Sequence, residues 1–125
     1  MAAPLRRVLM RAARGAMKGA DAARWHYGAG FDPGRAAEQH DGLAGLVAAS
    51  GAEILWLDDI EDGLADSVFT HDPSLMTDFG AIILRMGKPL RAPEPALHEA
   101  AYARLGIPIL GRIEAPGQVE GGDCV

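Results

Sequence analysis

Short hydrophobic runs alternate along this chain with glycine, proline and acidic turns, and this alternation predicts a mixture of strands and helices. A helix is predicted over residues 35–49, because apolar residues recur there at spacings of three and four. These residues are Ala36, Ala37, His40, Leu43, Ala44 and Val47. A second helix is predicted over residues 94–104. Strands are predicted over residues 5–10, 53–57, 67–71, 80–85 and 107–113, with 53–57 of the buried type.

Glycine and proline mark the connections between these elements. Residues 11–33 contain several glycines and an Asp-Pro-Gly turn, so we expect a long loop there. A loop of that length in a compact domain is usually functional or mobile. Gly51 and Gly106 end the two helices, and Pro93 and Pro95 mark the start of the second.

One unit of the pattern recurs along the chain. The segments ASGAEILWL and RLGIPILGRI both pass from a helix end through a glycine into a hydrophobic strand, and their glycines lie 55 positions apart. Two rounds of strand, strand, helix and strand favour a repeat architecture. A simple two-layer α/β domain fits the pattern equally well.

Composition limits the classes of function. The chain has 125 residues, 49% of them hydrophobic, which is typical of one globular domain. Its formal net charge of −5 disfavours nucleic acid as a partner, because phosphate binding needs a basic surface. The first residues are nevertheless basic and the middle is acidic; we interpret the basic cluster as a solvated strand end, with an organellar transit peptide as the alternative.

The same composition bears on location. No apolar run is long enough for a signal peptide or a membrane helix, so no membrane role is expected. The single cysteine, Cys124, excludes an internal disulfide and favours a reducing compartment. We therefore expect a cytoplasmic protein.

Candidate chemistry begins with the segment DSVFTHDP at residues 66–73. If residues 68–71 are extended, Asp66 and Asp72 share one face with Val68 and Thr70, and His71 lies on the other face. Two carboxylates on one face suit a guanidinium, whose planar fork matches carboxylate geometry. The structural alternative is that Asp66 caps a turn and that Asp72, before a proline, starts one.

Two further segments carry charged groups beside glycine. Arg85, Lys88 and Arg91 lie on a turn that follows a predicted strand, and they either bind a substrate carboxylate or are simply solvated. Glu120 precedes Gly121 and Gly122. Glycines at such a place let the backbone pass close to a ligand or to another strand, and a neighbouring carboxylate can hold a cation or orient a histidine.

Taken together, the segments DSVFTHDP, GAIILRMGKPLR and IEAPGQVEGGD occur in this order over nearly the whole chain and resemble the guanidino-group modifying enzymes. The dimethylargininase branch is the nearest, with arginine deiminases and amidinotransferases as relatives. The resemblance implies a pentein fold, in which five strand–strand–helix–strand modules surround a pseudo-fivefold axis. This chain would supply modules at about 1–60 and 61–115 and the start of a third at about 116.

The resemblance also implies roles for individual residues. Asp66 and Asp72 match positions that bind the guanidinium and the adjoining amino-acid groups of the substrate. Arg91 matches an arginine on the carboxylate side of the substrate, and Arg85 matches a neighbour of less defined role. Glu120 matches the acid that orients and charges the catalytic histidine.

Two other positions matter to the resemblance. The loop before Phe31 matches a lid over the pocket. His71 stands where dimethylargininases usually have a glutamate that helps to hold the substrate's amino group. This departure leaves open which guanidino compound is the substrate.

The implied mechanism needs no cofactor and no metal. A cysteine thiolate attacks the guanidinium carbon, a histidine protonates the leaving amine and activates water, and a covalent thiouronium is hydrolysed to a citrulline-type product. In the family, that histidine and cysteine follow the segment that matches residues 113–123. None of the histidines here (His26, His40, His71 and His98) matches the catalytic one, and we interpret Cys124 as a small buried hydrophobe on a core strand.

We therefore expect the N-terminal part of a cysteine-dependent hydrolase that acts on arginine or a methylated arginine. It would be inactive alone and would need a C-terminal half or a partner chain. Exposed module edges also predict self-association. The alternatives are a non-catalytic pentein-type binding or assembly module, or an amidinotransferase-type relative.

Overall fold

The computed structural model describes residues 3–125, and the chain folds into two compact units, Met1–Val68 and Phe69–Val125. Each unit combines strands and helices, so the α/β class predicted from the sequence is confirmed. The two units are described separately below.

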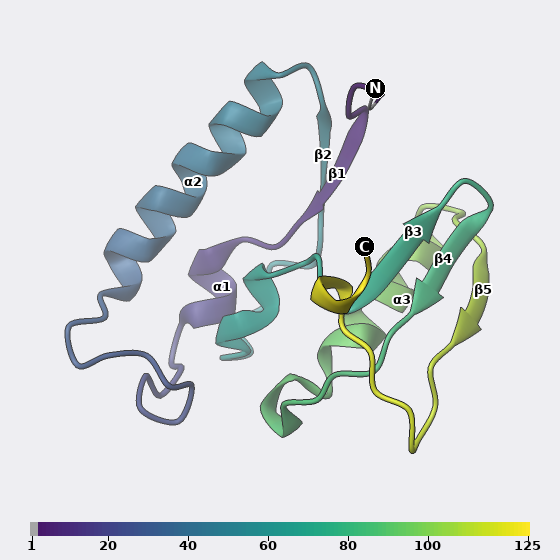
Figure 1. Cartoon of the computed structure of the whole chain (residues 1–125). Coiled ribbons are helices and arrows are strands. Elements are labelled where there is room, and N and C mark those ends of the chain that lie inside the picture. Colours follow the sequence, from purple (N-terminus) through teal and green to yellow (C-terminus); the bar gives the residue numbers. More distant parts are fainter. Residues whose placement is uncertain (1–2) are drawn as a thin grey trace. The chain divides into compact units, whose positions relative to one another are not determined.

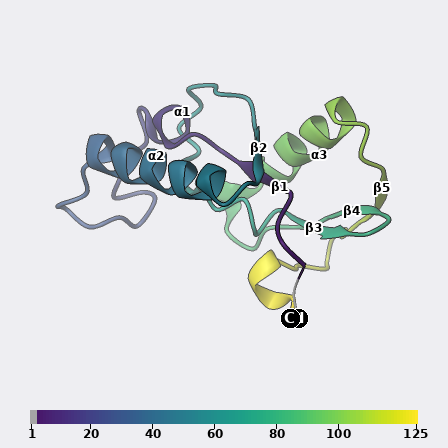
Figure 2. The ribbon, with the colours of Figure 1, turned by 90° about the horizontal axis from the view of Figure 1, so that it is seen from above.

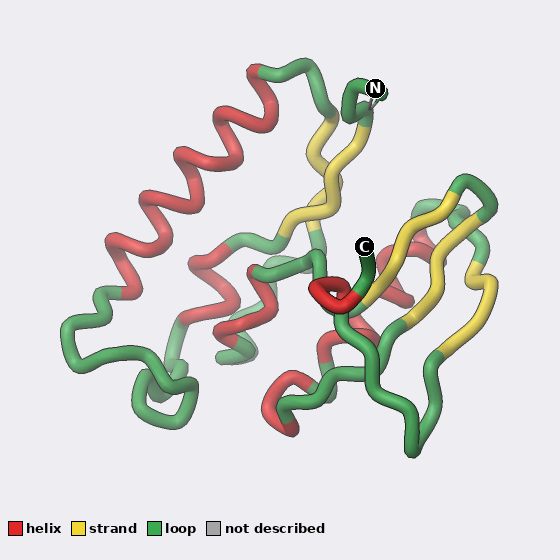
Figure 3. The backbone as a smooth tube through the Cα atoms, in the orientation of Figure 1, coloured by secondary structure: helices red, strands yellow, loops and turns green. Residues whose placement is uncertain are grey.

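The first unit is built around two parallel strands. Strand β1 (Arg7–Met10) pairs with β2 (Glu53–Trp56), with Arg7 opposite Glu53 and Met10 opposite Trp56. Helix α1 (Ala13–Met17) and the long helix α2 (Pro33–Ala49) lie between them in sequence, and α2 runs alongside the strand pair (Figure 1). A 3₁₀ turn, Ala65–Val68, ends the unit and packs against α1 (Figure 3).

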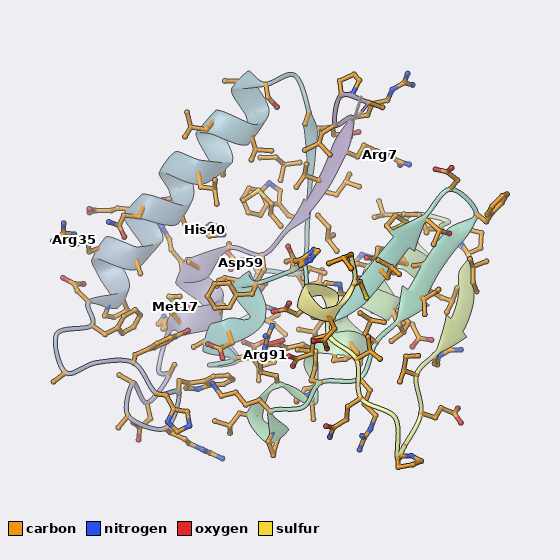
Figure 4. The ribbon with its side chains drawn as sticks, viewed as in Figure 1. Arg7, Met17, Arg35, His40, Asp59 and Arg91 are labelled. Carbon is orange, nitrogen blue, oxygen red and sulfur yellow. The ribbon has the colours of Figure 1, made fainter. Side chains whose placement is uncertain are left out.

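Helix α2 begins two residues before its predicted start because of a local cap. Oδ1 of Asp32 accepts hydrogen bonds from the backbone N–H groups of Gly34 (2.9 Å) and Arg35 (3.1 Å), and Pro33 occupies the first helical position. Its predicted apolar side is confirmed except at Leu43, which is exposed. Figure 4 shows His40 on the side of α2 that faces the strands, and its ring centroid lies 6.5 Å from that of Trp56.

Two predictions for the first unit were wrong. Residues 11–33 are not a continuous loop, because α1 forms within them. The misleading residue is Gly15, which lies inside α1: a Cβ there would overlap the side chain of Asp59, so the glycine serves close packing and not a turn. The strand at 53–57 was also expected to be buried, yet β2 exposes Glu53 and Trp56.

The second unit has the order strand, strand, helix and strand, although its first strand is not the one predicted. Strand β3 (Ser74–Thr77) pairs antiparallel with β4 (Gly80–Ile83), which pairs in parallel with β5 (Ile109–Arg112). Helix α3 (Glu94–Arg104) connects β4 to β5 and covers one face of the sheet (Figure 2). Short 3₁₀ turns occur at Pro89–Arg91 and Gly121–Asp123.

The strand expected over residues 67–71 is absent from the described chain, and β3 begins at Ser74 instead. Hydrogen bonds from Ser67 N to Leu64 O (2.9 Å) and from Asp72 N to Phe69 O (3.2 Å) fold this segment into turns. The predicted alternation of side chains, with Asp66 and Asp72 on one face of a strand, was therefore wrong. The segment consists of turns, as the alternative interpretation held, but Asp66 lies inside a 3₁₀ turn and Asp72 ends a turn instead of starting one.

Helix α3 packs a polar stripe against the sheet. Glu94, His98 and Tyr102 lie one helical turn apart and are all buried. Oγ of Ser74 lies 2.9 Å from Nδ1 of His98 and 2.6 Å from the hydroxyl of Tyr102. Burial and, secondarily, the positive charge of Arg91 lower the pKa of His98 to about 4. His98 is therefore a packed, neutral histidine.

None of the helices within residues 3–125 combines the length and the hydropathy that crossing a membrane would require.

We predict that stability falls with acidification because of His98. Its pKa is 6.5 when unfolded and about 4 when folded, so the unfolded chain binds the extra proton between these values. This stabilisation is present above pH 6.5 and is lost as the pH approaches 4, by at most on the order of 3 kcal/mol. Urea unfolding followed by circular dichroism should show that the unfolding free energy falls less over this pH range in His98→Gln than in the wild type. The exposed-site variant His71→Gln should keep the wild-type dependence; an unchanged slope in His98→Gln would contradict the assignment.

Candidate functional site

In the first unit, Asp66 is bound by Tyr27, which lies in the segment between α1 and α2. Asp66 lies in the 3₁₀ turn Ala65–Val68, is buried, and accepts a hydrogen bond of 2.6 Å at Oδ1 from the hydroxyl of Tyr27. The ring of Tyr27 lies 4.5 Å, centroid to centroid, from that of Phe31. The loop before Phe31 is thus attached to a carboxylate predicted to bind substrate, while its role as a lid stays a prediction.

Asp72 and Arg91 form the centre of the second unit's polar cluster. Arg91 is labelled in Figure 4. Its Nη1 donates to Oδ2 of Asp72 at 2.8 Å. Its Nε donates to both carboxylate oxygens of Glu94, at 2.8 and 3.1 Å, and its Nη2 donates to the carbonyl of Phe69 at 3.3 Å. The ring of Phe69 also lies 6.0 Å from the guanidinium.

The guanidinium of Arg91 is therefore buried and strongly bound. Only 6% of the residue is exposed. Burial lowers the pKa of Arg91, but the hydrogen bonds and negative charges of Asp72 and Glu94 outweigh this effect and the pKa is raised. In this cluster, Asp72 is the partly accessible member, with 23% of its side chain exposed.

Gly121 brings the segment of Glu120 against that of Asp72. The N–H of Gly121 donates to the carbonyl of Asp72 at 3.0 Å, and a Cβ at this position would overlap the carbonyl oxygen of His71. The prediction that a glycine here lets two backbones approach is confirmed. Glu120 is half-buried, and its Oε1 accepts a hydrogen bond from the backbone N–H of Gly87 at 3.2 Å.

Arg85 and His71 have different surroundings. Arg85 bridges to Val119 through two backbone hydrogen bonds, and its Nη1 donates to the carbonyl of Gly117 at 3.1 Å. It lines a hollow of about 570 Å³ whose walls come from the end of β4 and the segment after it, the first half of α3 and residues 112–118. Asp72, Arg91 and Glu120 do not line this hollow. The side chain of His71 is exposed.

The second unit thus connects most of the predicted site residues. Asp72 and Arg91 touch directly, and Gly121 joins the backbone of His71 and Asp72 to the segment of Glu120. Arg85 is attached to the same 117–120 segment but faces the separate hollow. Asp66 belongs to the first unit.

Sequence reasoning missed two residues of these clusters. Glu94 binds Arg91, and the only signal was its spacing, three positions after the arginine. Tyr27 binds Asp66 from within a glycine-rich loop, and no periodic pattern marked it.

Cys124 was expected on a core strand, and this was wrong. It ends the 3₁₀ turn Gly121–Asp123 and is half-buried, with its Sγ 3.8 Å from the carbonyl oxygen of Glu120. Within residues 3–125, no three His, Cys, Asp or Glu side chains are grouped so that they could hold a metal ion. The partly exposed carboxylate of Asp72 is the group of this cluster that suits a planar cation, while the guanidinium of Arg91 is held inside the protein.

Comparison with known proteins found similar enzymes and no matching family model. The chain is 37% identical over 94 residues to an N(G),N(G)-dimethylarginine dimethylaminohydrolase from Pseudomonas aeruginosa. The aligned residues cover 75% of this chain and 37% of that enzyme. The Streptomyces coelicolor enzyme of the same name is 37% identical over 94 residues, covering 36% of its length.

Solved structures agree with these relatives. A dimethylarginine dimethylaminohydrolase adduct with S-methyl-L-thiocitrulline matches with a TM-score of 0.74 and 32% identity, over 95% of this chain and 46% of that one. A mutant of the Pseudomonas aeruginosa enzyme complexed with citrulline gives the same values. The likeness supports the pentein fold, while the number of modules stays a prediction. The chain spans less than half the length of these proteins.

We predict that Gly121→Ala disrupts the second unit. The added methyl group would overlap the backbone of His71, so we expect a loss of about 3 kcal/mol or more in unfolding free energy. The matched control is Gly122→Ala, whose Cβ would lie 3.9 Å from Oδ1 of Asp72, an ordinary contact. Urea unfolding should separate the two variants, and equal stabilities would show that the close approach is not needed.

Proposed function

We propose that this chain, as a member of the guanidino-group modifying superfamily, supplies the guanidinium-binding part of a hydrolase. It matches the N-terminal part of dimethylarginine dimethylaminohydrolases in sequence and fold. The substrate class is arginine or a methylated arginine. The enzyme would use a cysteine and release a citrulline-type product.

The observation that carries this proposal is the pair between Asp72 and Arg91. The carboxylate of Asp72 already binds one guanidinium, that of Arg91, at 2.8 Å, and part of Asp72 is exposed. Arg91 occupies Oδ2 of Asp72, and we propose that the exposed part of this carboxylate accepts a second charged, planar hydrogen-bond donor, that of the ligand. The names of the relatives point the same way, since those proteins act on dimethylarginine or were solved with citrulline and S-methyl-L-thiocitrulline.

The predicted residues take distinct roles in this proposal. Asp66 and Asp72 hold the guanidinium and the adjoining amino-acid groups, and Arg91 serves the carboxylate side. Glu120 orients and charges a histidine, fixing its tautomer as the acid of a catalytic triad does. His71 changes how the substrate's amino group is held, and Arg85 is a neighbouring residue without an assigned role.

The proposed hydrolysis needs a thiolate and a histidine that none of the site residues named above supplies. A thiolate attacks the guanidinium carbon and the C–N bond to the leaving amine breaks, with a histidine supplying the proton. Water then attacks the thiouronium carbon and releases the thiolate with a ureido product. We propose that the 125 residues alone bind the ligand without turning it over, and that a further segment or partner chain completes the site.

Exposed apolar residues support the need for a partner. Met76, Phe79 and Leu110 of the second unit are largely exposed. In the described part of the chain, β3 and β5 are the outer strands of their sheet. Unpaired edges and apolar side chains promote association, so we include self-association or a partner chain in the proposal.

We predict that the chain binds guanidino ligands through its carboxylates. Calorimetric titration with L-arginine, dimethylarginine and agmatine should detect binding, and Asp66→Asn and Asp72→Asn should each weaken it about tenfold or more. A hydrogen bond to a charged group contributes about 1.5–3 kcal/mol, and losing it raises the dissociation constant about tenfold or more. Asp41→Asn is the matched control, because Asp41 forms an exposed ion pair with Arg14. Binding that survives both site variants would contradict the assignment.

We predict no turnover by the 125-residue chain. A colorimetric assay for citrulline, run with each ligand at saturation, should stay at background, and it should rise when a chain that supplies the histidine and cysteine is added. Citrulline formed by the chain alone would contradict this prediction. Ligand binding that no added chain converts into turnover would instead favour a non-catalytic binding module.

A further inference from the structure

We propose that Glu94 is a positioning residue for the guanidinium site: it fixes Arg91 so that Arg91 fixes the carboxylate of Asp72. This proposal rests on the proposed function, because it assigns to Asp72 the binding of a guanidino ligand. It extends that function to a buried residue of α3.

Glu94 has its carboxylate in a place where a charge is costly. It is 0% exposed at the first position of α3, and burying an unpaired carboxylate costs far more than burying an apolar side chain. The N-terminus of the helix favours its negative charge. Its close partner is the Nε of Arg91, which lies 2.8 and 3.1 Å from its two oxygens.

This contact sets the orientation of the whole guanidinium. The group is planar, so holding Nε also directs Nη1 and Nη2. In that orientation Nη1 donates to Oδ2 of Asp72 and Nη2 donates to the carbonyl of Phe69. Arg91 thus clamps the turn that carries Asp72 against the start of α3.

Solvent exposure decreases from Asp72 through Arg91 to Glu94. The side chain of Asp72 is 23% exposed, that of Arg91 is 8% exposed and that of Glu94 is 1% exposed. A ligand can therefore reach Asp72, while Glu94 acts only through Arg91. This is the arrangement expected of a group that orients a binding residue without touching the ligand.

The polar stripe of α3 holds the other side of the same turn. His98 and Tyr102 follow Glu94 on the buried side of α3 and both bind Oγ of Ser74. Ser74 begins β3, two residues after Asp72. Arg91 thus fixes the side chain of Asp72, and β3, which begins two residues later, fixes its backbone.

The test compares Glu94→Gln with Glu99→Gln in the full chain. Glutamine keeps the shape of Glu94 and removes its charge, whereas Glu99 lies on the same helix in an exposed pair with Arg112. Calorimetry with L-arginine should show affinity reduced about tenfold in Glu94→Gln and unchanged in Glu99→Gln. Adding Asp72→Asn to Glu94→Gln should cost little more, because both changes act at one carboxylate.

NMR supplies a readout that does not depend on ligand binding. The Nε–H resonance of Arg91 and the side-chain carboxyl resonance of Asp72 should both shift in Glu94→Gln, with the backbone spectrum of β3, β4 and β5 preserved. In Glu99→Gln both should stay in place. If Glu94→Gln leaves the Asp72 resonance unmoved, the proposal is overturned, whether or not L-arginine binds.

The outcomes separate this inference from the proposed function. Wild-type affinity for L-arginine that persists in Glu94→Gln overturns the positioning role and leaves the proposed function standing. A wild-type chain that binds none of the guanidino ligands overturns the proposed function, and the Asp72 resonance then decides the role of Glu94. Equal losses of affinity in Glu94→Gln and Glu99→Gln would indicate a general effect on α3 and would also overturn the proposal.

Discussion

The second unit depends on how one buried guanidinium is neutralised. Arg91 is almost completely removed from water, and its charge is tolerated because Asp72, Glu94 and a backbone carbonyl accept its hydrogen bonds. These contacts join the turn at residues 69–72 to the start of α3. Removing any one acceptor leaves a buried charge with incomplete pairing, so the site and the fold share the same constraint.

Neighbouring features extend this constraint. Ser74, His98 and Tyr102 continue the polar contacts along α3, and burial keeps His98 neutral close to the positive charge of Arg91. Gly121 places the segment of Glu120 against the same turn from the other direction. Asp72, Arg91 and Glu120, to which we assign roles in binding and orientation, are thereby brought together within one unit.

Local sequence patterns predicted those parts that local physics determines. Helix α3 spans the predicted residues 94–104, and Gly121 marks a close backbone approach as expected. The strand predicted over residues 67–71 was wrong because so short a run with few apolar residues does not distinguish a strand from a turn. The bonds of Glu94 and Tyr27 join residues whose partners are chosen by tertiary packing, and periodicity carries no information about them.

The contact between Gly121 and Asp72 also has a consequence for synthesis. These residues are far apart in sequence, so the turn that carries Asp72 leaves the ribosome long before its partner backbone exists. Contacts of such sequence separation form late, and until then the turn and the neighbouring strand edge stay open to other chains. Slow translation between α3 and Gly121 would therefore lengthen the interval in which a nascent chain needs protection by chaperones.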